Sequence, residues 1–447
     1  MKKEQTKAVS FDFIGGKDVM PIGGFYGPYS PSLDRGKDII PEYVSKEIFQ
    51  LIAEAGINLI TASADDYAVL PEKVIKSLEL GEEFGIGIFV QDGNIFKGIG
   101  NESFTVEEAK NAISKYAHYA SYCGVHLVDE PDTSYYLGEP GVKGPRDVSN
   151  YGHIAKILQE DIGLYCYSNM FPTMYAEDKV RNYKRYVEEF CETIRPKILI
   201  WDYYPFDKCR EERWPMYFWN MDIIRQYSNK MNVPFWASIQ AGSQWAEGGL
   251  VEFDSEMPYY PNEAQFNWNI NTCLAFGVQG FQYFPLIEPY HFAYGKSTEW
   301  DFERNGIIGA AGNKTQWFHY AKKINQHIRA IDEVLMNSVN KGIIVSGEEA
   351  IKNMELTTCV IETGRFEELL AVAGDAMVGC FNFQGKTALY VVNHSMQIAQ
   401  NIELEFIETE NIRVIQNAKE TYVTKKHLTL NMAPGEGVLL VIQQCSA

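Results

Sequence analysis

Long hydrophobic runs and clusters of basic residues are both missing from this sequence of 447 residues. A membrane-spanning helix needs ~20 consecutive apolar residues, and no stretch comes near that length. The formal net charge is −19, whereas a protein that binds nucleic acid needs a basic face for the phosphates. We therefore expect neither a membrane nor a nucleic acid as a partner, and a neutral or cationic ligand fits this charge better.

Paired cysteines and a secretion signal are also missing. The eight cysteines include no CxxC pair and no zinc-ligand spacing, so most of them should be buried, reduced thiols. The N-terminal stretch "MKKEQTKAVSFDFIGG" has Glu4, Gln5 and Thr6 where a signal peptide carries its apolar segment. These features predict a cytoplasmic protein, with no metal and no cofactor.

What the sequence does contain is a series of short apolar runs separated by segments with helical periodicity. The runs are "VMPIGGFYG" (19–27), "INLITAS" (57–63), "GIGIFVQD" (85–92), "GVHLVDEP" (124–131), "GLYCYSNM" (163–170), "KILIWDYY" (197–204), "PFWASIQAG" (234–242) and "GVQGFQYFPL" (277–286). The helical segments are 41–56, 105–124, 151–163, 180–196, 218–232, 262–277 and 317–335. Eight β–α units predict a parallel sheet closed into a (β/α)₈ barrel over residues 1–338. An open doubly wound sheet is the alternative, but no GxGxxG motif follows the first strand.

The last part of the chain, residues 339–447, has a different texture. Its apolar runs are short, turn residues separate them, and no segment has helical periodicity. Such a pattern is typical of an antiparallel β-sandwich. We expect this domain to be a structural module packed on the barrel.

Polar and aromatic residues follow the apolar runs of the predicted barrel. In (β/α)₈ enzymes the reactive groups lie at the carboxyl ends of the strands, where the loops converge. The residues expected at this end are Tyr26, Tyr29, Asp65, Asp66, Asp92, Asp129, Glu130, Asn169, Trp201, Asp202, Tyr203, Tyr204, Gln240, Trp245, Tyr283, Glu288 and His291.

The stretch "GVHLVDEPDTSYY" (124–136) is the most informative of these strand ends. Pro131 ends the strand, so Glu130 should lie at the rim of the barrel. A carboxyl group surrounded by aromatic rings keeps a raised pKa and can donate a proton at neutral pH. The alternative is that Asp129 and Glu130 cap the next helix or pair with a basic loop residue.

Two further strand ends combine carboxylates with aromatic rings. In "LIWDYYPF" (199–206), Asp202 has Trp201, Tyr203 and Tyr204 as neighbours, which suits sugar hydroxyls and sugar C–H faces. The alternative there is a core aromatic cluster with an aspartate that satisfies a turn. In "FQYFPLIEPYH" (281–291), Glu288 is either a second catalytic carboxylate or an anchor of its loop. The aromatic content of 13% fits sugar stacking and a large aromatic core equally well.

The chain resembles the clan A glycoside hydrolases, and within them the β-galactosidase-like branch. The resemblance rests on "VDEP" (128–131), "WDYYPF" (201–206) and "LAFGVQGFQYFPL" (274–286), and on the C-terminal sandwich that finishes "LTLNMAPGEGVLLVI". It implies hydrolysis of a glycosidic bond with Glu130, the strand-four glutamate, as general acid/base. The sequence departs from the clan at strand seven, where the clan has its nucleophilic glutamate and this chain has Gln240.

Three hypotheses follow. The first is a hydrolase acting on a small glycoside or short oligosaccharide, with Glu130 as acid/base and Glu288 or Asp202 as nucleophile or base. The residues expected to bind the carbohydrate are Tyr26, Asp92, Asp129, Asn169, Trp201, Tyr203, Tyr204, Gln240, Trp245, Tyr283 and His291. The second hypothesis, prompted by Gln240, is a barrel that binds carbohydrate without cleaving it. The third, metal-assisted isomerase or aldolase chemistry, has no ligand spacing and no strand-end lysine to support it.

Overall fold

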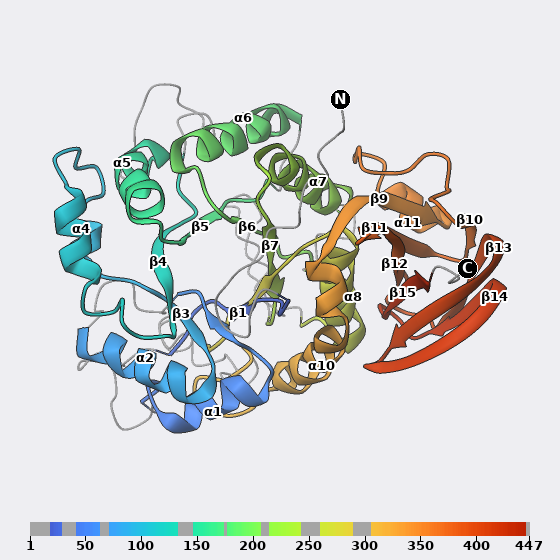
Figure 1. The fold of residues 1–447 in the computed structure, drawn as a ribbon, viewed down its shortest axis with the longest axis horizontal. Helices are drawn as coiled ribbons and strands as arrows, with labels where there is room; N and C mark the ends of the chain where they lie inside the picture. Colours follow the sequence, from blue (N-terminus) through green and yellow to red (C-terminus); the bar gives the residue numbers. More distant parts are fainter. Residues whose placement is uncertain are drawn as a thin grey trace, which may run out of the picture.

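Eight short parallel strands close into a barrel in the computed structural model of the protein, and helices surround this barrel (Figure 1). The structure describes residues 18–28, 42–62, 71–132, 146–173, 177–206, 214–242, 260–288 and 305–443. The strands pair in chain order, and β8 returns to β1. The predicted (β/α)₈ barrel is therefore confirmed, and the open doubly wound sheet is wrong.

Each of the eight predicted runs overlaps one strand of the barrel. The barrel strands are β1 (Ile22–Gly24), β2 (Leu59–Ile60), β3 (Gly87–Val90), β4 (Tyr122–Asp129), β5 (Cys166–Met170), β6 (Leu199–Asp202), β7 (Phe235–Gln240) and β8 (Phe281–Phe284). The helices are α1 (Lys46–Glu54), α2 (Pro71–Phe84), α3 (Gly93–Phe96), α4 (Val106–Ile113), η1 (Val148–Tyr151), α5 (Gly152–Lys156), η2 (Ile157–Ile162), α6 (Glu177–Ile194), α7 (Trp214–Met231), α8 (Glu263–Ala275) and α10 (Gln316–Met336).

Local sequence signals set the ends of several helices. Helix α4 begins with a capping box, in which Thr105 and Glu108 each bond the other's backbone N–H. Helix α1 begins at the N-cap Ser45, and Gly56 follows its end with a φ of +79°, which favours glycine. The stretch 105–124, expected as one helix, is shorter as α4 because β4 already begins at Tyr122.

A β-bulge in β4 decides which of its side chains face the barrel interior. This strand pairs with β5 at His126 and again at Asp129, and Leu127 is the extra residue between these positions. Side chains of a strand alternate between its two faces, so an extra residue shifts the alternation by one. The bulge therefore turns Asp129 toward the same side as His126.

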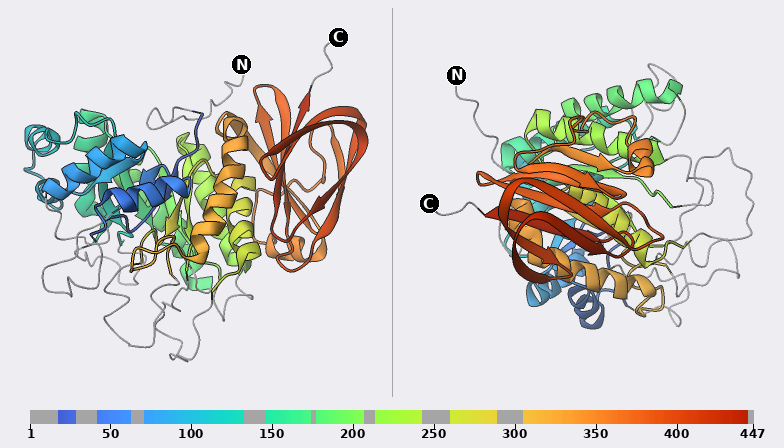
Figure 2. Two further views of the ribbon diagram at one scale, coloured as in Figure 1. Left: turned by 90° about the horizontal axis from the view of Figure 1, so that it is seen from below. Right: turned by 90° about the vertical axis from the view of Figure 1, so that its right-hand side faces the viewer.

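The C-terminal module is one seven-stranded antiparallel sheet that curls into a sandwich-like shape (Figure 2). Its elements are β9 (Ser338–Ser346), α11 (Glu348–Asn353), β10 (Leu369–Ala373), β11 (Ala376–Phe383), β12 (Lys386–Asn393), β13 (Gln400–Gln416), β14 (Lys419–Met432) and β15 (Gly437–Gln443). Along β12, Leu389 and Val391 enter the module's own core, whereas Tyr390 and Val392 join the core that continues into the barrel. The predicted antiparallel C-terminal domain is confirmed.

Two details of this module differ from the expectation. Helix α11, which was not expected, has six residues, a length too short to show helical periodicity. Strand β13 is continuous over 401–407 and 412–416, although the sequence has two separate apolar runs in these segments. The exposed residues Glu408 and Asn411 interrupt the apolar alternation there, although the backbone pairing with β14 continues after a register shift.

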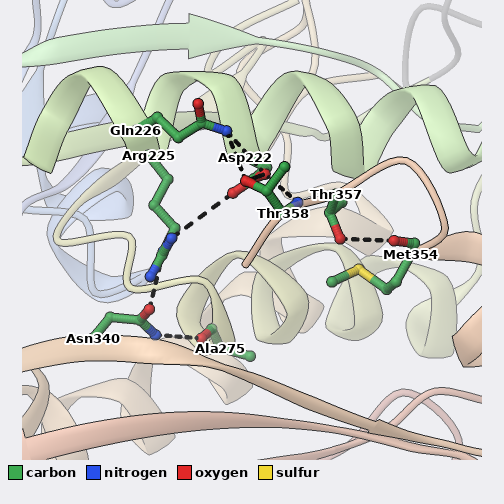
Figure 3. Close-up of polar contacts among 8 residues, drawn as sticks. All are labelled: Asp222, Arg225, Gln226, Ala275, Asn340, Met354, Thr357 and Thr358. Carbon is green, nitrogen blue, oxygen red and sulfur yellow. Dashed lines mark hydrogen bonds and ion pairs between the residues drawn. The ribbon is translucent and has the colours of Figure 1, made fainter. Parts of the chain in front are cut away.

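Polar contacts join the module to the barrel helix α7 (Figure 3). Asp222 accepts hydrogen bonds from the backbone N–H of Thr358 at 2.7 Å and from its hydroxyl at 2.8 Å. Arg225 donates to Asn340 Oδ1 at 3.0 Å, and Asn340 donates to the carbonyl of Ala275 at 3.0 Å. These bonds, together with the shared apolar core, fix the module against α7 and α8.

Among the described residues, no helix combines the length and the apolar character that a membrane crossing requires. Six of the eight cysteines lie in the described ranges, and all six are buried free thiols. The cytoplasmic location expected from the sequence stays a prediction.

Candidate active site

Acidic and amide side chains meet at the carboxyl ends of β4, β5 and β6. Asp129 and Asn169 are direct partners in the β4–β5 register, and Asn169 Nδ2 donates to Asp129 Oδ1 at 3.1 Å. The Asn169 amide also hydrogen-bonds the carboxyl group of Asp202 at the end of β6. The structure thus brings together three residues that the sequence placed on three different strands.

Glu130 lies directly beyond this layer in an unusual backbone conformation. Its φ is +48°, in the left-handed region, and its N–H donates to the Asn169 carbonyl at 3.0 Å. Tyr186 donates to the carbonyl of Pro131 at 3.0 Å, and the guanidinium of Arg146 donates to the backbone carbonyl of Asp129. A left-handed non-glycine residue costs on the order of 1–3 kcal/mol and persists where its surroundings hold it, often at functional sites.

Asp202 is the most deeply buried carboxylic acid among these residues. The residue is only 5% exposed, and its carboxyl group is hydrogen-bonded to Glu130. Burial raises the pKa of Asp202 to about 7, and the charge of Asp129 acts in the same direction, against the hydrogen bonds from Glu130 and Asn169. Asp202 Oδ1 and Asn169 Oδ1 are both buried, and neither has a hydrogen-bond partner within the described part of the chain. We call Asp129, Glu130, Asn169 and Asp202 the acid cluster.

Four aromatic rings from β1, β6 and β8 lie at the same end of the barrel. Tyr204 stacks on Phe284 with ring centroids 5.1 Å apart, and Tyr26 lies 5.4 Å from Phe284. Phe25 contacts both Tyr26 and Phe284. The charges of Asp202, Glu130 and Asp129 add to burial in raising the pKa of Tyr204, which places its hydroxyl close to the acid cluster. We call Phe25, Tyr26, Tyr204 and Phe284 the aromatic wall.

A neutral polar network forms the layer of the barrel beneath the acid cluster. Gln282 donates to Tyr167 Oη at 2.7 Å and to Ser238 Oγ at 2.8 Å, and it accepts from Thr61 at 2.5 Å. His126 stacks on Tyr167 with centroids 4.6 Å apart, and burial lowers its pKa to about 4. The sequence analysis missed this network. Counting back two residues from Asn169 and from Phe284, along the alternation of the strands, would have found Tyr167 and Gln282.

Glu288 follows β8 and is separate from the acid cluster in its contacts. It is 6% exposed, and burial raises its pKa to about 7. Among the described residues, its carboxyl group receives a long hydrogen bond of 3.5 Å from Asn305. Asn305 also packs over Gly242, just beyond β7, so Glu288 lies near the ends of β7 and β8.

The side chain of Gln240, at the end of β7, is held by hydrogen bonds to the backbone. Its Nε2 donates to the carbonyls of Phe206 at 2.9 Å and Gly242 at 3.1 Å, and its Oε1 accepts from the N–H of Phe206 at 3.1 Å. The side chain therefore ties the end of β7 to the loop after β6. An amide makes these bonds because it has both donors and an acceptor.

Three of the expected rings face the surrounding helices and do not join the aromatic wall. Trp201 stacks on Tyr217 of α7 with centroids 5.8 Å apart, and Tyr203 meets the same ring at 5.3 Å. Tyr283 donates to Asn325 Oδ1 of α10 at 2.7 Å. All three side chains are at most 2% exposed, so their proposed contact with a ligand has no support from their positions.

Asp92 also lies on the helix side of the barrel. It caps α3 and accepts hydrogen bonds from the N–H of Asn94 at 2.8 Å and from Tyr116 at 2.7 Å. Lys115 forms an ion pair with it at 2.8 Å. Burial raises the pKa of Asp92, but the bonds from Lys115 and Tyr116 outweigh it and hold the pKa below its usual value. The structure does not bring Asp92 to the acid cluster.

Five expected residues, Tyr29, Asp65, Asp66, Trp245 and His291, lie outside the described residues. Within the described ranges, no three His, Cys, Asp or Glu side chains are placed to hold a metal ion.

Comparisons with known proteins give only distant similarities. The sequence matches no protein-family model and no curated protein. A family 39 glycoside hydrolase from Bacteroides cellulosilyticus WH2 is similar over 95% of this chain and 82% of its own, with 12% identity and a TM-score of 0.49. A β-galactosidase from the psychrophilic Marinomonas ef1 is similar over 75% of this chain, which spans 65% of that enzyme, with 11% identity and a TM-score of 0.48. A glucosidase from Croceicoccus marinus is similar over 96% of both chains, with 10% identity and a TM-score of 0.43. Similarities this weak carry no argument about the activity of this chain.

Proposed function

We propose that the protein is a glycoside hydrolase in which Glu130 acts as general acid/base. The observation that supports this most is a pair of buried oxygens next to Glu130, Asn169 Oδ1 and Asp202 Oδ1, for which the described residues supply no hydrogen-bond donor. A buried acceptor without a donor costs about 1–3 kcal/mol. A ligand that donates several hydrogen bonds, such as a sugar with its hydroxyl groups, would remove this cost.

The aromatic wall supports a sugar ligand for a separate reason. Tyr26, Tyr204 and Phe284 are only partly buried, and aromatic faces of this kind accept the C–H faces of a sugar ring. A carbohydrate seated between the wall and the acid cluster would meet apolar rings on one side and hydrogen-bond acceptors on the other. This arrangement favours a small glycoside or the end of an oligosaccharide as the substrate.

Glu288 is the better candidate for the second catalytic carboxylate. The reacting carboxyl groups of glycosidases lie ~5–5.5 Å apart for retention and ~6.5–9.5 Å apart for inversion. Asp202 is hydrogen-bonded to Glu130. Two carboxyl groups in hydrogen-bond contact are too close for a glycosidic bond to lie between them. Glu288 has no such contact with Glu130 and lies near the ends of β7 and β8.

The test is hydrolysis of a panel of aryl glycosides by the full chain and its variants. Glu130→Gln should lower kcat/KM by ~10²–10⁴-fold, the contribution of general acid catalysis, and Glu288→Gln should lower it at least as much. The matched control is Glu107→Gln on the exposed face of α4, which should leave the rate unchanged. No turnover of any glycoside by the unmodified chain would contradict the proposal.

A barrel that binds carbohydrate without cleaving it is the second candidate, and Gln240 at strand seven favours it. In that case titration calorimetry would give saturable sugar binding with no product, and Glu130→Gln would keep the affinity. Hydrolysis that disappears in Glu130→Gln would exclude this candidate.

A further inference from the structure

The polar network beneath the acid cluster contains two hydroxyl groups whose hydrogens no described residue accepts. Tyr167 Oη and Ser238 Oγ lie 2.7 Å and 2.8 Å from the same nitrogen, Nε2 of Gln282. This amide nitrogen donates one hydrogen to each hydroxyl oxygen, so each hydroxyl keeps its own hydrogen. Burial raises the pKa of Tyr167 well above its usual value, and the charge of Asp129 acts in the same direction, so this hydroxyl stays protonated.

A short contact on the other side of Gln282 fixes the direction of its amide group. Thr61 Oγ1 lies 2.5 Å from Oε1 of Gln282. This distance suits an O–H···O hydrogen bond and is shorter than an N–H···O bond, which spans ~2.7–3.2 Å. The amide oxygen therefore faces Thr61, and the amide nitrogen faces Tyr167 and Ser238. The reverse orientation would use the hydrogens of both hydroxyls on Gln282.

Two buried acceptors lie next to these donors. Asp202 and Ser238 are direct partners in the β6–β7 register, so their side chains share a face of the sheet. This face is the barrel interior, because Trp201 before Asp202 packs on α7. Asn169 follows Tyr167 by two residues on β5, so both side chains leave that strand on the same face. Within the described part of the chain, Asp202 Oδ1 and Asn169 Oδ1 have no donor.

The chemistry of these four groups selects the kind of ligand that joins them. Ser238 and Asp202 lie on adjacent strands, which run ~4.8 Å apart, yet the hydroxyl does not bond the free carboxyl oxygen. A bridging group must accept from a hydroxyl and donate to a carboxyl or amide oxygen. A sugar hydroxyl does both, whereas an ammonium group only donates and a carboxylate only accepts.

We propose that Tyr167 and Ser238 form the floor of the sugar site and donate to one hydroxyl group of the substrate, which in turn donates to Asp202 or Asn169. This rests on the proposed function, because it takes the acid cluster as the place where the substrate binds. It adds the substrate class, a neutral sugar in preference to the corresponding deoxy sugar, amino sugar or uronic acid. Gln282 is a positioning residue, since its amide group orients both hydroxyls.

The experiment combines Tyr167→Phe with a series of monodeoxy aryl glycosides. The substitution keeps the ring that stacks on His126. We expect it to lower kcat/KM for the parent glycoside about tenfold or more. In the unmodified chain, one monodeoxy glycoside should lose about 100-fold or more. With that glycoside, Tyr167→Phe should change kcat/KM by less than about twofold, because the hydroxyl that Tyr167 contacts is already absent.

Two further variants make the result independent of a single substitution. Ser238→Ala should depend on the same hydroxyl of the substrate as Tyr167→Phe does. Tyr390→Phe is the matched control, because it removes a buried hydroxyl that donates to Asn271 at 2.8 Å, at the contact between barrel and module. It should leave kcat/KM unchanged for every glycoside of the series.

Three results would overturn the assignment. One is an equal loss in Tyr167→Phe with the parent and with every monodeoxy glycoside, because the hydroxyl then holds a buried water, which makes the same hydrogen bonds. Another is an unchanged kcat/KM in both Tyr167→Phe and Ser238→Ala. The third is faster cleavage of the amino or uronic analogue than of the neutral parent.

Calorimetric titration with the free sugars separates this assignment from the proposed hydrolysis. If the unmodified chain cleaves no glycoside but binds a neutral sugar about tenfold more tightly than Tyr167→Phe does, the floor exists and the hydrolysis alone fails. If glycosides are cleaved without any dependence on Tyr167 or Ser238, the hydrolysis stands and the floor fails. A chain that neither cleaves nor binds these sugars refutes both.

Discussion

Two buried aspartates, Asp222 on α7 and Asp202 at the end of β6, differ in how their charge is compensated. Asp222, 1% exposed, accepts from Thr358 twice and from Gln226 at 3.1 Å, and Arg225 lies 3.8 Å away. Asp202, 5% exposed, has no facing cation among the described residues. In each residue, one buried oxygen has no hydrogen-bond partner among the described residues, but at Asp222 this oxygen, Oδ1, is the one that faces Arg225. The charge of Asp222 is therefore compensated by a cation, and the charge of Asp202 is not.

This difference indicates a structural role for Asp222 and favours a ligand contact at Asp202. Burying a charge is expensive unless donors and an opposite charge surround it, so a compensated carboxylate such as Asp222 stabilises the fold at the contact between barrel and module. An uncompensated one has a perturbed pKa and an unused hydrogen-bond acceptor, both of which a ligand can exploit. The comparison predicts opposite effects for substitutions at the two positions.

The largest effect on stability is expected at Asp222. Asp222→Ala leaves Arg225 and the donors of Thr358 without their acceptor, and breaking a buried pair in this way costs about 3–5 kcal/mol. Urea unfolding, followed by fluorescence, should show this loss in the free energy of unfolding. Asn229→Ala, on the exposed part of the same helix, is the control and should change stability by less than about 0.5 kcal/mol. Equal losses in the two variants would mean that the contacts in Figure 3 contribute nothing.

At Asp202 the effect of a substitution on stability should have the opposite sign. The pKa of Asp202 is raised to about 7 in the folded protein, so between pH 4 and pH 7 the folded state binds more protons than the unfolded state does. Stability from this group is therefore present at low pH and lost as the pH rises through about 7. Asp202→Asn removes that loss, and a shift of about three pKa units corresponds to a stabilisation of up to about 4 kcal/mol at pH 8.

The advantage of Asp202→Asn should shrink as the pH falls and vanish near pH 4, where the carboxyl group is neutral in both states. Urea unfolding at pH 8 and at pH 5 gives this difference. A variant that is less stable than the unmodified chain at pH 8 would show that Asp202, like Asp222, is compensated in the folded protein.

The sequence predicts the barrel well because each strand of a closed parallel barrel is buried on both faces and reads as a short apolar run. The residues at the rim are predicted less well, because every residue at a strand end was expected to point into the barrel mouth. Side chains alternate, so Asp202 and Tyr204 lie at the barrel mouth while Trp201 and Tyr203 pack on α7. Applying the alternation to "LIWDYYPF" would have separated the two pairs.

The alternation of side chains does not predict the orientation of Asp129. Strict alternation from His126 would turn Val128 inward, and only the bulge at Leu127 reverses this. A bulge depends on how two strands pair, which no local signal in "GVHLVDEP" reveals. The same holds for Gln240: its partners Phe206 and Gly242 belong to loops that only the folded barrel brings together.

The smallest effect should come from restoring the clan's glutamate at strand seven. Gln240→Glu replaces the Nε2 donor by an oxygen that faces the carbonyls of Phe206 and Gly242, so at least one hydrogen bond is lost. We expect the free energy of unfolding to fall by about 1–2 kcal/mol, against no change in Gln397→Glu at an exposed position. Because the side chain is held by the loop after β6, the new carboxylate should not increase hydrolysis. A tenfold or greater rise in kcat/KM would show instead that the strand-seven position still reaches the substrate, and Glu288 would then lose its place as the second carboxylate.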